Sequence, residues 1–295
     1  MTRRQKEAAI KKLLGGVASL SIIALALIVL FLFREGLPIF EKVTLADFLL
    51  GNAWYPTYDP PSFGIFPLIV ASVVVTVLSC LVAVPLGVLA ALYISEIAGP
   101  RVREVLKAVI ELMAGLPSVV LGFFGMVILA PWLQETFDLP TGLNIVNASL
   151  ILAVMAVPTI CSISEDALYA VPREFREASQ ALGATKGETI VGVVMPAALS
   201  GIFTAIILGM ARAMGETMVV LMTAGGAAAV PESIFDAVRP MTASIAAEMG
   251  EAPFGGDHYH ALFATGIVLF FITLAFNVLA SHLSHRFRET GSATL

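Results

Sequence analysis

Six apolar stretches, each of 20 or more residues, constrain this chain more than any other feature of its sequence. A helix rises about 1.5 Å per residue, so about 20 residues cross the hydrocarbon core of a bilayer. The chain has 295 residues, of which 58% are hydrophobic and 13% charged, and its mean hydropathy of +0.91 lies far outside the range of soluble domains. We therefore predict an all-α integral membrane protein with six transmembrane helices. The predicted spans are residues 13–33, 64–94, 105–133, 148–169, 191–223 and 260–283.

Basic residues are distributed unevenly between the two sides of the predicted membrane. Most of the 17 Lys and Arg residues precede the first span, follow the sixth, or lie between spans two and three or four and five. Because cytoplasmic loops carry the excess of Lys and Arg, this distribution predicts that both termini are cytoplasmic. The net charge of −5 arises largely from acidic outer loops, and the sequence carries no basic footprint for nucleic acid.

Two charged residues, Arg212 and Glu216, lie within the fifth predicted span. A continuous helix from Ala197 would place Arg212 about 22 Å along the span, and residues four apart share one helical face. An arginine at that depth costs on the order of 3 kcal/mol even on lenient insertion scales, so it is expected to face protein, water or a ligand. Arginine also donates two parallel hydrogen bonds to an oxyanion and keeps its charge when buried. We interpret Arg212, Glu216 and Thr217 as part of a path for an anionic solute; the alternative is a salt bridge that only ties helices together.

A second candidate feature interrupts the third predicted span, where Gly115, Pro117 and Ser118 lie close together. Proline removes one backbone hydrogen bond and pushes on the preceding turn, which a membrane tolerates only where the freed carbonyl meets protein or water. We expect a kink that faces the bundle interior near the path. A kink that serves only close packing through glycine is the alternative.

Two longer segments are predicted to lie outside. Residues 34–63 hold Trp54, Tyr55 and Tyr58 among prolines, which favours an aromatic belt at the membrane surface, with contact to an external partner as the alternative. Residues 225–259 begin with a run of Gly and Ala and then become polar. That change is compatible with a short re-entrant or interfacial helix.

The loop between spans four and five carries the most specific pattern. Pro172 is placed to begin a short amphipathic helix that Gly183 ends in a left-handed conformation. The pattern consists of Glu177, Ala178, Gly183, Val193, Met195 and Pro196. It resembles the EAA loop of ABC importer permeases. The resemblance implies that this loop, about residues 171–196, docks on a separate ATPase subunit, with Glu177, Ala178 and Gly183 as coupling residues.

Further segments narrow the resemblance. Residues 209–218 and 110–125 are similar to the permeases of the high-affinity phosphate uptake system, and residues 33–40 with Met218 favour its C-type subunit. The resemblance implies the type I (MetI-like) permease fold with a cytoplasmic coupling helix, in a bacterial or archaeal cytoplasmic (inner) membrane. It also implies a heterodimer with a related A-type permease, two ATPase chains and an external phosphate-binding protein.

The same resemblance divides the chain into three parts. Residues 1–63 are expected to form an N-terminal transmembrane helix with its external segment, and residues 64–285 the permease core. Residues 286–295 are expected to be a cytoplasmic tail.

Other kinds of site are not supported by the sequence. The chain has no G-x-x-x-x-G-K-[ST] run and hence no P-loop, so we expect a transport subunit and not an enzyme. Cys80 and Cys161 lie in different spans, and His258 and His260 lack a third ligand, so no metal or cofactor is expected. One Arg and one Glu do not distinguish phosphate from sulfate, molybdate or tungstate, which remain alternative cargoes. A passive anion channel is less favoured, because a docking loop has no role in one.

Overall fold

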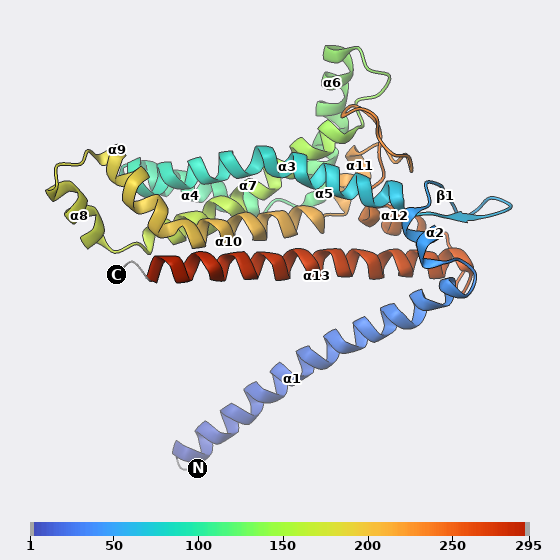
Figure 1. The fold of residues 1–295 in the computed structure, drawn as a ribbon, viewed down its shortest axis with the longest axis horizontal. Coiled ribbons are helices and arrows are strands. Elements are labelled where there is room, and N and C mark those ends of the chain that lie inside the picture. Colours follow the sequence, from blue (N-terminus) through green and yellow to red (C-terminus); the bar gives the residue numbers. More distant parts are fainter. Residues whose placement is uncertain (1–2, 293–295) are drawn as a thin grey trace.

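The computed structural model describes residues 3–292, with side chains described for residues 10–279, 281 and 282. Long helices lie along one axis and form a bundle (Figure 1). Six helical segments among the described residues are long and apolar enough to cross a membrane, so the predicted fold class is confirmed. These segments are Ile10–Glu41, Phe66–Ile97, Ser118–Phe137, Ile145–Tyr169, Lys186–Met214 and Asp257–Leu279.

Three helices form the core of the bundle. They are α3 (Phe66–Leu92), α7 (Ile145–Tyr169) and α10 (Met195–Met214). Both α3 and α10 bring a glycine against Ile160 of α7: a Cβ atom added at Gly87 would lie 2.8 Å from the Ile160 side chain, and one at Gly209 would lie 2.5 Å from it. Because lipid tails are as apolar as leucine, close packing of this kind is what joins helices inside a bilayer.

The first and last helices differ in how they meet this core. The last helix, α13 (Asp257–Ser292), packs along α10, whereas α1 (Arg3–Gly36) diverges from α13 and leaves the bundle (Figure 1). Gly36 lies against Ala264 and Ile267 of α13, so the two helices meet at the C-terminal end of α1. None of the apolar window of α1 is buried within the chain.

The boundaries predicted for the third span, 105–133, are wrong. Separate helices occupy this region: α4 (Pro100–Ala114), α5 (Ser118–Phe124) and, after a π-helical turn (Gly125–Leu129), α6 (Ala130–Phe137). Pro117 adopts an extended conformation before α5, so the expected kink is a complete break. No residue of α4 is buried, and charged and apolar residues alternate along it. The boundary was wrong because a count of apolar residues does not detect such an amphipathic helix.

The fifth predicted span, 191–223, also ends early. The helix α10 stops at Met214, Gly215 caps it, and a separate short helix, α11 (Met218–Thr223), follows. Glycine is a poor helix former because it has the largest conformational entropy to lose, which favours a break at this position.

The predicted helix between spans four and five is confirmed. It is α8 (Arg173–Ala181), which follows Pro172 and ends before Gly183, whose φ of +88° is left-handed. A capping box between Thr185 and Glu188 then begins α9 (Lys186–Thr189), which leads through a π-helical turn into α10. Figure 1 shows that α8 projects beyond the ends of α10 and α13.

Short elements cover the opposite end of the bundle. They are α2 (Leu45–Leu50), the antiparallel strands β1 (Trp54–Tyr55) and β2 (Ser62–Phe63), and α12 (Met241–Glu248). Trp54 is only 2% exposed and belongs to a buried cluster with Phe48 and Leu262. The interpretation of this residue as part of an aromatic belt at the membrane surface is therefore wrong. Tyr55 and Tyr58 are exposed and stack on each other. Residues 225–259 contain one short helix, α12, and its re-entrant or interfacial position stays a prediction.

The packing of α10 on α7 generates a prediction about Gly201. A Cβ atom at Gly201 would lie 2.3 Å from the Cβ of Ala167, and alanine has no rotamer that relieves the clash. Gly201→Ala is therefore expected to destabilise the protein by about 1–3 kcal/mol, measured as a lower thermal midpoint in detergent. Gly192→Ala is the control, since nothing lies within 4 Å of its new Cβ. A midpoint for Gly201→Ala equal to that of the control, or no recovery when Ala167→Gly is added, would contradict this packing.

Candidate functional site

Arg212 lies in the last turn of α10, and its side chain is exposed on the surface of the chain. Within the described residues it takes part in no hydrogen bond or ion pair. Glu216 and Thr217 are half-buried and lie beyond the end of α10, in the break before α11. The prediction that Arg212 and Glu216 share one helical face is wrong, because the backbone leaves the helix at Gly215 and the four-residue spacing no longer sets their geometry.

The break between α10 and α11 lies well inside the bundle. The expectation that Arg212 lies at the middle of a continuous helix is wrong. Glu216 shares a small cavity with Ser72 and Thr76 of α3. Those residues follow Phe66, the first residue of α3, by six and ten positions, which corresponds to depths of about 9 and 15 Å along the helix. The break is therefore surrounded by helices and does not lie at the end of the bundle.

Hydroxyl groups and α12 close this region. The Thr242 hydroxyl of α12 donates to the carbonyl oxygen of Glu216 at 2.8 Å, and the Met241 N–H donates to the Ser72 hydroxyl at 2.9 Å. The cavity that they surround has a volume of about 10 Å³. A single water molecule needs roughly that volume, so this cavity is too small to hold an oxyanion.

A larger cavity nearby does not suit an anion. It has a volume of about 230 Å³ and lies between α3, α10 and α13, where Ile207, Met214 and Phe276 are among the residues that line it. Its lining is almost entirely apolar, and an anion placed there would lose its hydration without gaining hydrogen bonds.

The break around Pro117, the second feature predicted from the sequence, lies beside the break that follows α10. Gly122 of α5 faces Val219 and Met222 of α11, and Gly125 faces Thr223. Later residues of α5 and its following turn contact later residues of α11, so the two segments run parallel. Their N-terminal ends therefore lie side by side. The fold thus brings the break at Gly115, Pro117 and Ser118 and the break at Gly215, Glu216 and Thr217 to corresponding positions.

The predicted coupling residues lie on a free surface. Glu177, Ala178 and Gly183 are exposed, and no residue of α8 is buried. Leu182, at the end of α8, is 91% exposed. These residues are therefore accessible on the surface of the chain.

Sequence reasoning missed a hub of polar contacts centred on Glu248. Its carboxylate accepts hydrogen bonds from Trp54 Nε1 at 3.0 and 3.1 Å, lies 2.8 Å from His258 Nε2 and forms an ion pair with Arg239. These partners come from β1, α13 and the segment before α12, so Glu248 fastens α12 over the break. Residues that are far apart in sequence give no periodic signal that would have revealed this hub.

The hub generates a prediction about α12. Glu248→Gln removes the charge that binds Arg239 and His258, and the loss of a charge-assisted hydrogen bond worth about 1.5 kcal/mol should raise local opening about tenfold. The expected result is faster hydrogen exchange of the α12 amides. Glu251→Gln is the control, because its side chain is exposed and lies outside the hub. Equal α12 exchange in the two variants would show that Glu248 does not fasten this helix.

Comparisons with known proteins agree with one another on the family. The model of the family described as "Binding-protein-dependent transport system inner membrane component" matches residues 83–289. A chain from Bacillus subtilis named "Probable ABC transporter permease protein YqgH" is 40% identical over 271 residues, which cover 91% of this chain and 88% of its own. The "Phosphate transport system permease protein PstC" of Mesorhizobium japonicum is 32% identical over 260 residues, which cover 81% of this chain and 78% of its own.

Solved structures of importers share the fold. A chain of a bacterial alginate ABC transporter superposes with a TM-score of 0.68 at 15% identity, covering 97% of this chain and 98% of its own. A chain of the MetNI methionine ABC transporter in an inward-facing conformation gives a TM-score of 0.57 at 20% identity, covering 76% and 94%. At these identities the likeness concerns the fold alone.

Proposed function

Because this chain belongs to the family of binding-protein-dependent transport system inner membrane components, we propose that it is the permease subunit through which an ATP-driven importer moves inorganic phosphate into the cytoplasm. Relatives named as phosphate transport permeases support this cargo. The observation that carries the proposal is the guanidinium of Arg212, which has no partner among the described residues and stands at the break between α10 and α11.

The chemistry of phosphate suits this arrangement. Phosphate carries between one and two negative charges near neutral pH and must give up hydration to cross a bilayer. A guanidinium offsets that loss with two parallel, charge-assisted hydrogen bonds and is not neutralised by burial. Hydroxyl groups at Ser72, Thr76 and Thr242 surround the closed cavity. Each now donates its one proton to a backbone carbonyl group, so it would add a neutral donor only by turning away from that carbonyl as the cavity opens.

Glu216 and Thr217 complete the proposed path. The carbonyl of Glu216 is held by Thr242, whereas its carboxylate makes no ion pair within the described residues. We assign this carboxylate the role of binding Arg212 when the path is empty, in a conformation in which the break has rearranged. Phosphate would then compete with Glu216 for the same donors, and the Thr217 hydroxyl would contribute a further bond.

The energy source is a separate subunit, since the sequence holds no P-loop. We propose that the exposed surface of α8, with Glu177, Ala178 and Gly183, docks on an ATPase chain. The complete importer would contain two ATPase chains, a second, A-type permease and an external phosphate-binding protein. We place it in the cytoplasmic membrane with both termini inside, residues 64–285 as the permease core, residues 1–63 before it and residues 286–295 as the tail.

The proposal predicts the effect of changing Arg212. Arg212→Lys keeps the charge but loses the planar fork, and one lost charge-assisted hydrogen bond of about 1.5 kcal/mol corresponds to about a tenfold decrease in uptake. The measurement is uptake of labelled phosphate by vesicles that contain the assembled importer, with and without internal ATP. Arg34→Lys is the control, because the Arg34 side chain is largely exposed and lies in the last turn of α1, outside the proposed path.

Two results would contradict the proposal. Undiminished ATP-dependent uptake by an assembled Arg212→Lys importer would remove Arg212 from the path. Competition of sulfate, molybdate or tungstate at lower concentration than phosphate would replace the cargo, and ATP-independent flux would indicate a passive channel.

A further inference from the structure

The end of α3 nearest α8 has an irregular backbone that leaves acceptors exposed. After Leu92 the helix continues as a π-helical turn, Tyr93–Ile97, and the chain becomes extended at Ala98. The last carbonyl groups of a helix lack partners within it. Glu96 lies in this turn with its side chain only 10% exposed, so a buried carboxylate lies beside carbonyl groups at the end of the helix that accept hydrogen bonds from side chains.

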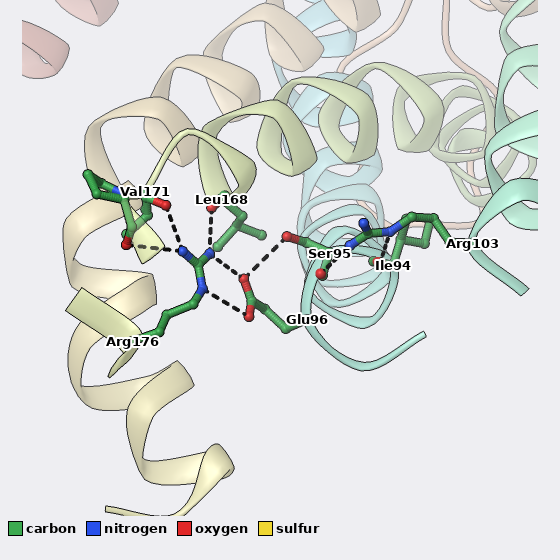
Figure 2. A network of polar contacts seen from close by, with 8 residues as sticks. Ile94, Ser95, Glu96, Arg103, Leu168, Val171 and Arg176 are labelled. Atoms are coloured by element: carbon green, nitrogen blue, oxygen red, sulfur yellow. Dashed lines mark hydrogen bonds and ion pairs between the residues drawn. The ribbon is translucent and has the colours of Figure 1, made fainter. Parts of the chain in front are cut away.

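One arginine fastens α4 to this point. Arg103 donates from Nε to the carbonyl oxygen of Ile94 at 2.8 Å and from its second terminal nitrogen to the carbonyl oxygen of Ser95 (Figure 2). The start of α4 is thereby fixed to the end of α3.

A second arginine joins three elements with one guanidinium. Arg176 of α8 bonds the Glu96 carboxylate at 2.7 Å, and it also donates to the carbonyl of Leu168 at 3.0 Å and that of Val171 at 2.6 Å (Figure 2). Leu168 lies in the last turn of α7, and Val171 lies just after that helix. Positive charge is favoured at a helix C-terminus, so both the carboxylate and the end of α7 stabilise this position of Arg176.

The polar contact between α8 and the end of α3 is confined to these two side chains. Among the described residues, every hydrogen bond and ion pair between α8 and the end of α3 is made by Arg176 with Glu96. The chain itself connects α8 to α7 and, through α9, to α10, but α3 has no such covalent link to α8. Removal of either side chain would leave the other as a largely buried charge without its partner.

We propose that the ion pair between Glu96 and Arg176 transmits the displacement of α8 to α3 during each ATP cycle. The proposal rests on the function proposed above. Ser72 and Thr76, which line the closed cavity beside Glu216, lie on the same helix as Glu96. A movement delivered to Glu96 therefore reaches the break along one continuous helix, in addition to the covalent route through α9 and α10. Glu96 and Arg176 act through α3 and are positioning residues.

The first test is the amount of phosphate imported per ATP hydrolysed by the complete importer in proteoliposomes. In Glu96→Gln we expect ATP hydrolysis to continue while phosphate imported per ATP falls at least fivefold. Glu104→Gln is the matched control, because Glu104 is exposed on the neighbouring helix α4. Arg176→Lys keeps a charge beside Glu96 but loses bonds to the carbonyl groups of Leu168 and Val171, so it should give an intermediate ratio. It also carries the test if Glu96→Gln does not assemble. A wild-type ratio in an assembled variant would overturn the proposal.

A second measurement is independent of the cargo. Spin labels at Gln180 on α8 and Leu89 on α3, both exposed positions, report the distance between these helices without nucleotide and with ATP. With the ion pair intact we expect the distance to stay constant between the two states, because α8 and α3 move together. In Glu96→Gln we expect it to change and its distribution to broaden; the same behaviour in both proteins would overturn the proposal. Should the unmodified importer move no phosphate, the proposed function fails, while the distance measurement still decides whether the ion pair joins the helices.

Discussion

The helix α10 is interrupted inside the helix bundle, and the elements around this break are arranged to satisfy it. Backbone groups that a helix break frees have no water to bind within a bilayer, and protein must satisfy them. Here Thr242 satisfies the carbonyl of Glu216, and Ser72 accepts a hydrogen bond from the first residue of α12. The position of α12 follows from this requirement, and the Glu248 hub, which holds α12 to the outer elements, follows from the position of α12.

The same arrangement explains why the conformation is closed. The elements that satisfy the break also fill it, so the remaining cavity has room for about one water molecule. On the proposed path, passage of an anion would require α12 or α3 to move relative to the break, and α3 leads from this region into the π-helical turn that holds Glu96 at the opposite end of the bundle. If the ion pair of Glu96 with Arg176 moves α3 together with α8, as proposed, opening at one end would be coupled to contacts at the other end, where α8 presents its exposed surface.

Periodicity and composition predicted much of this fold because burial in lipid is a local property of the sequence. Six apolar runs gave the six spans, and Pro172 with Gly183 predicted α8. The spans at Val105 and Val191 were misjudged since hydropathy does not record which face of a helix is charged or where the backbone leaves the helix.

The polar contacts between distant residues could not be predicted from the sequence. Arg212 stands out because a cation in an apolar run is rare, but its relation to Glu216 depends on the conformation of Gly215. The pair of Glu96 with Arg176 and the hub around Glu248 join residues that are distant along the chain. Only the tertiary fold brings them together, and a single sequence carries no signal of their proximity.

Passage of phosphate through the break between α10 and α11 can be tested by the reactivity of a cysteine placed there. Thr217→Cys would be introduced into a chain with Cys80→Ala and Cys161→Ala. Val191→Cys, in the π-helical turn before α10, would serve as the control. The labelling rate with a small anionic thiol reagent would be measured in the assembled importer during ATP turnover with binding protein present. The account predicts that phosphate slows labelling at position 217 several-fold and leaves labelling at 191 unchanged. An unchanged rate at 217, or equal slowing at both positions, would contradict it.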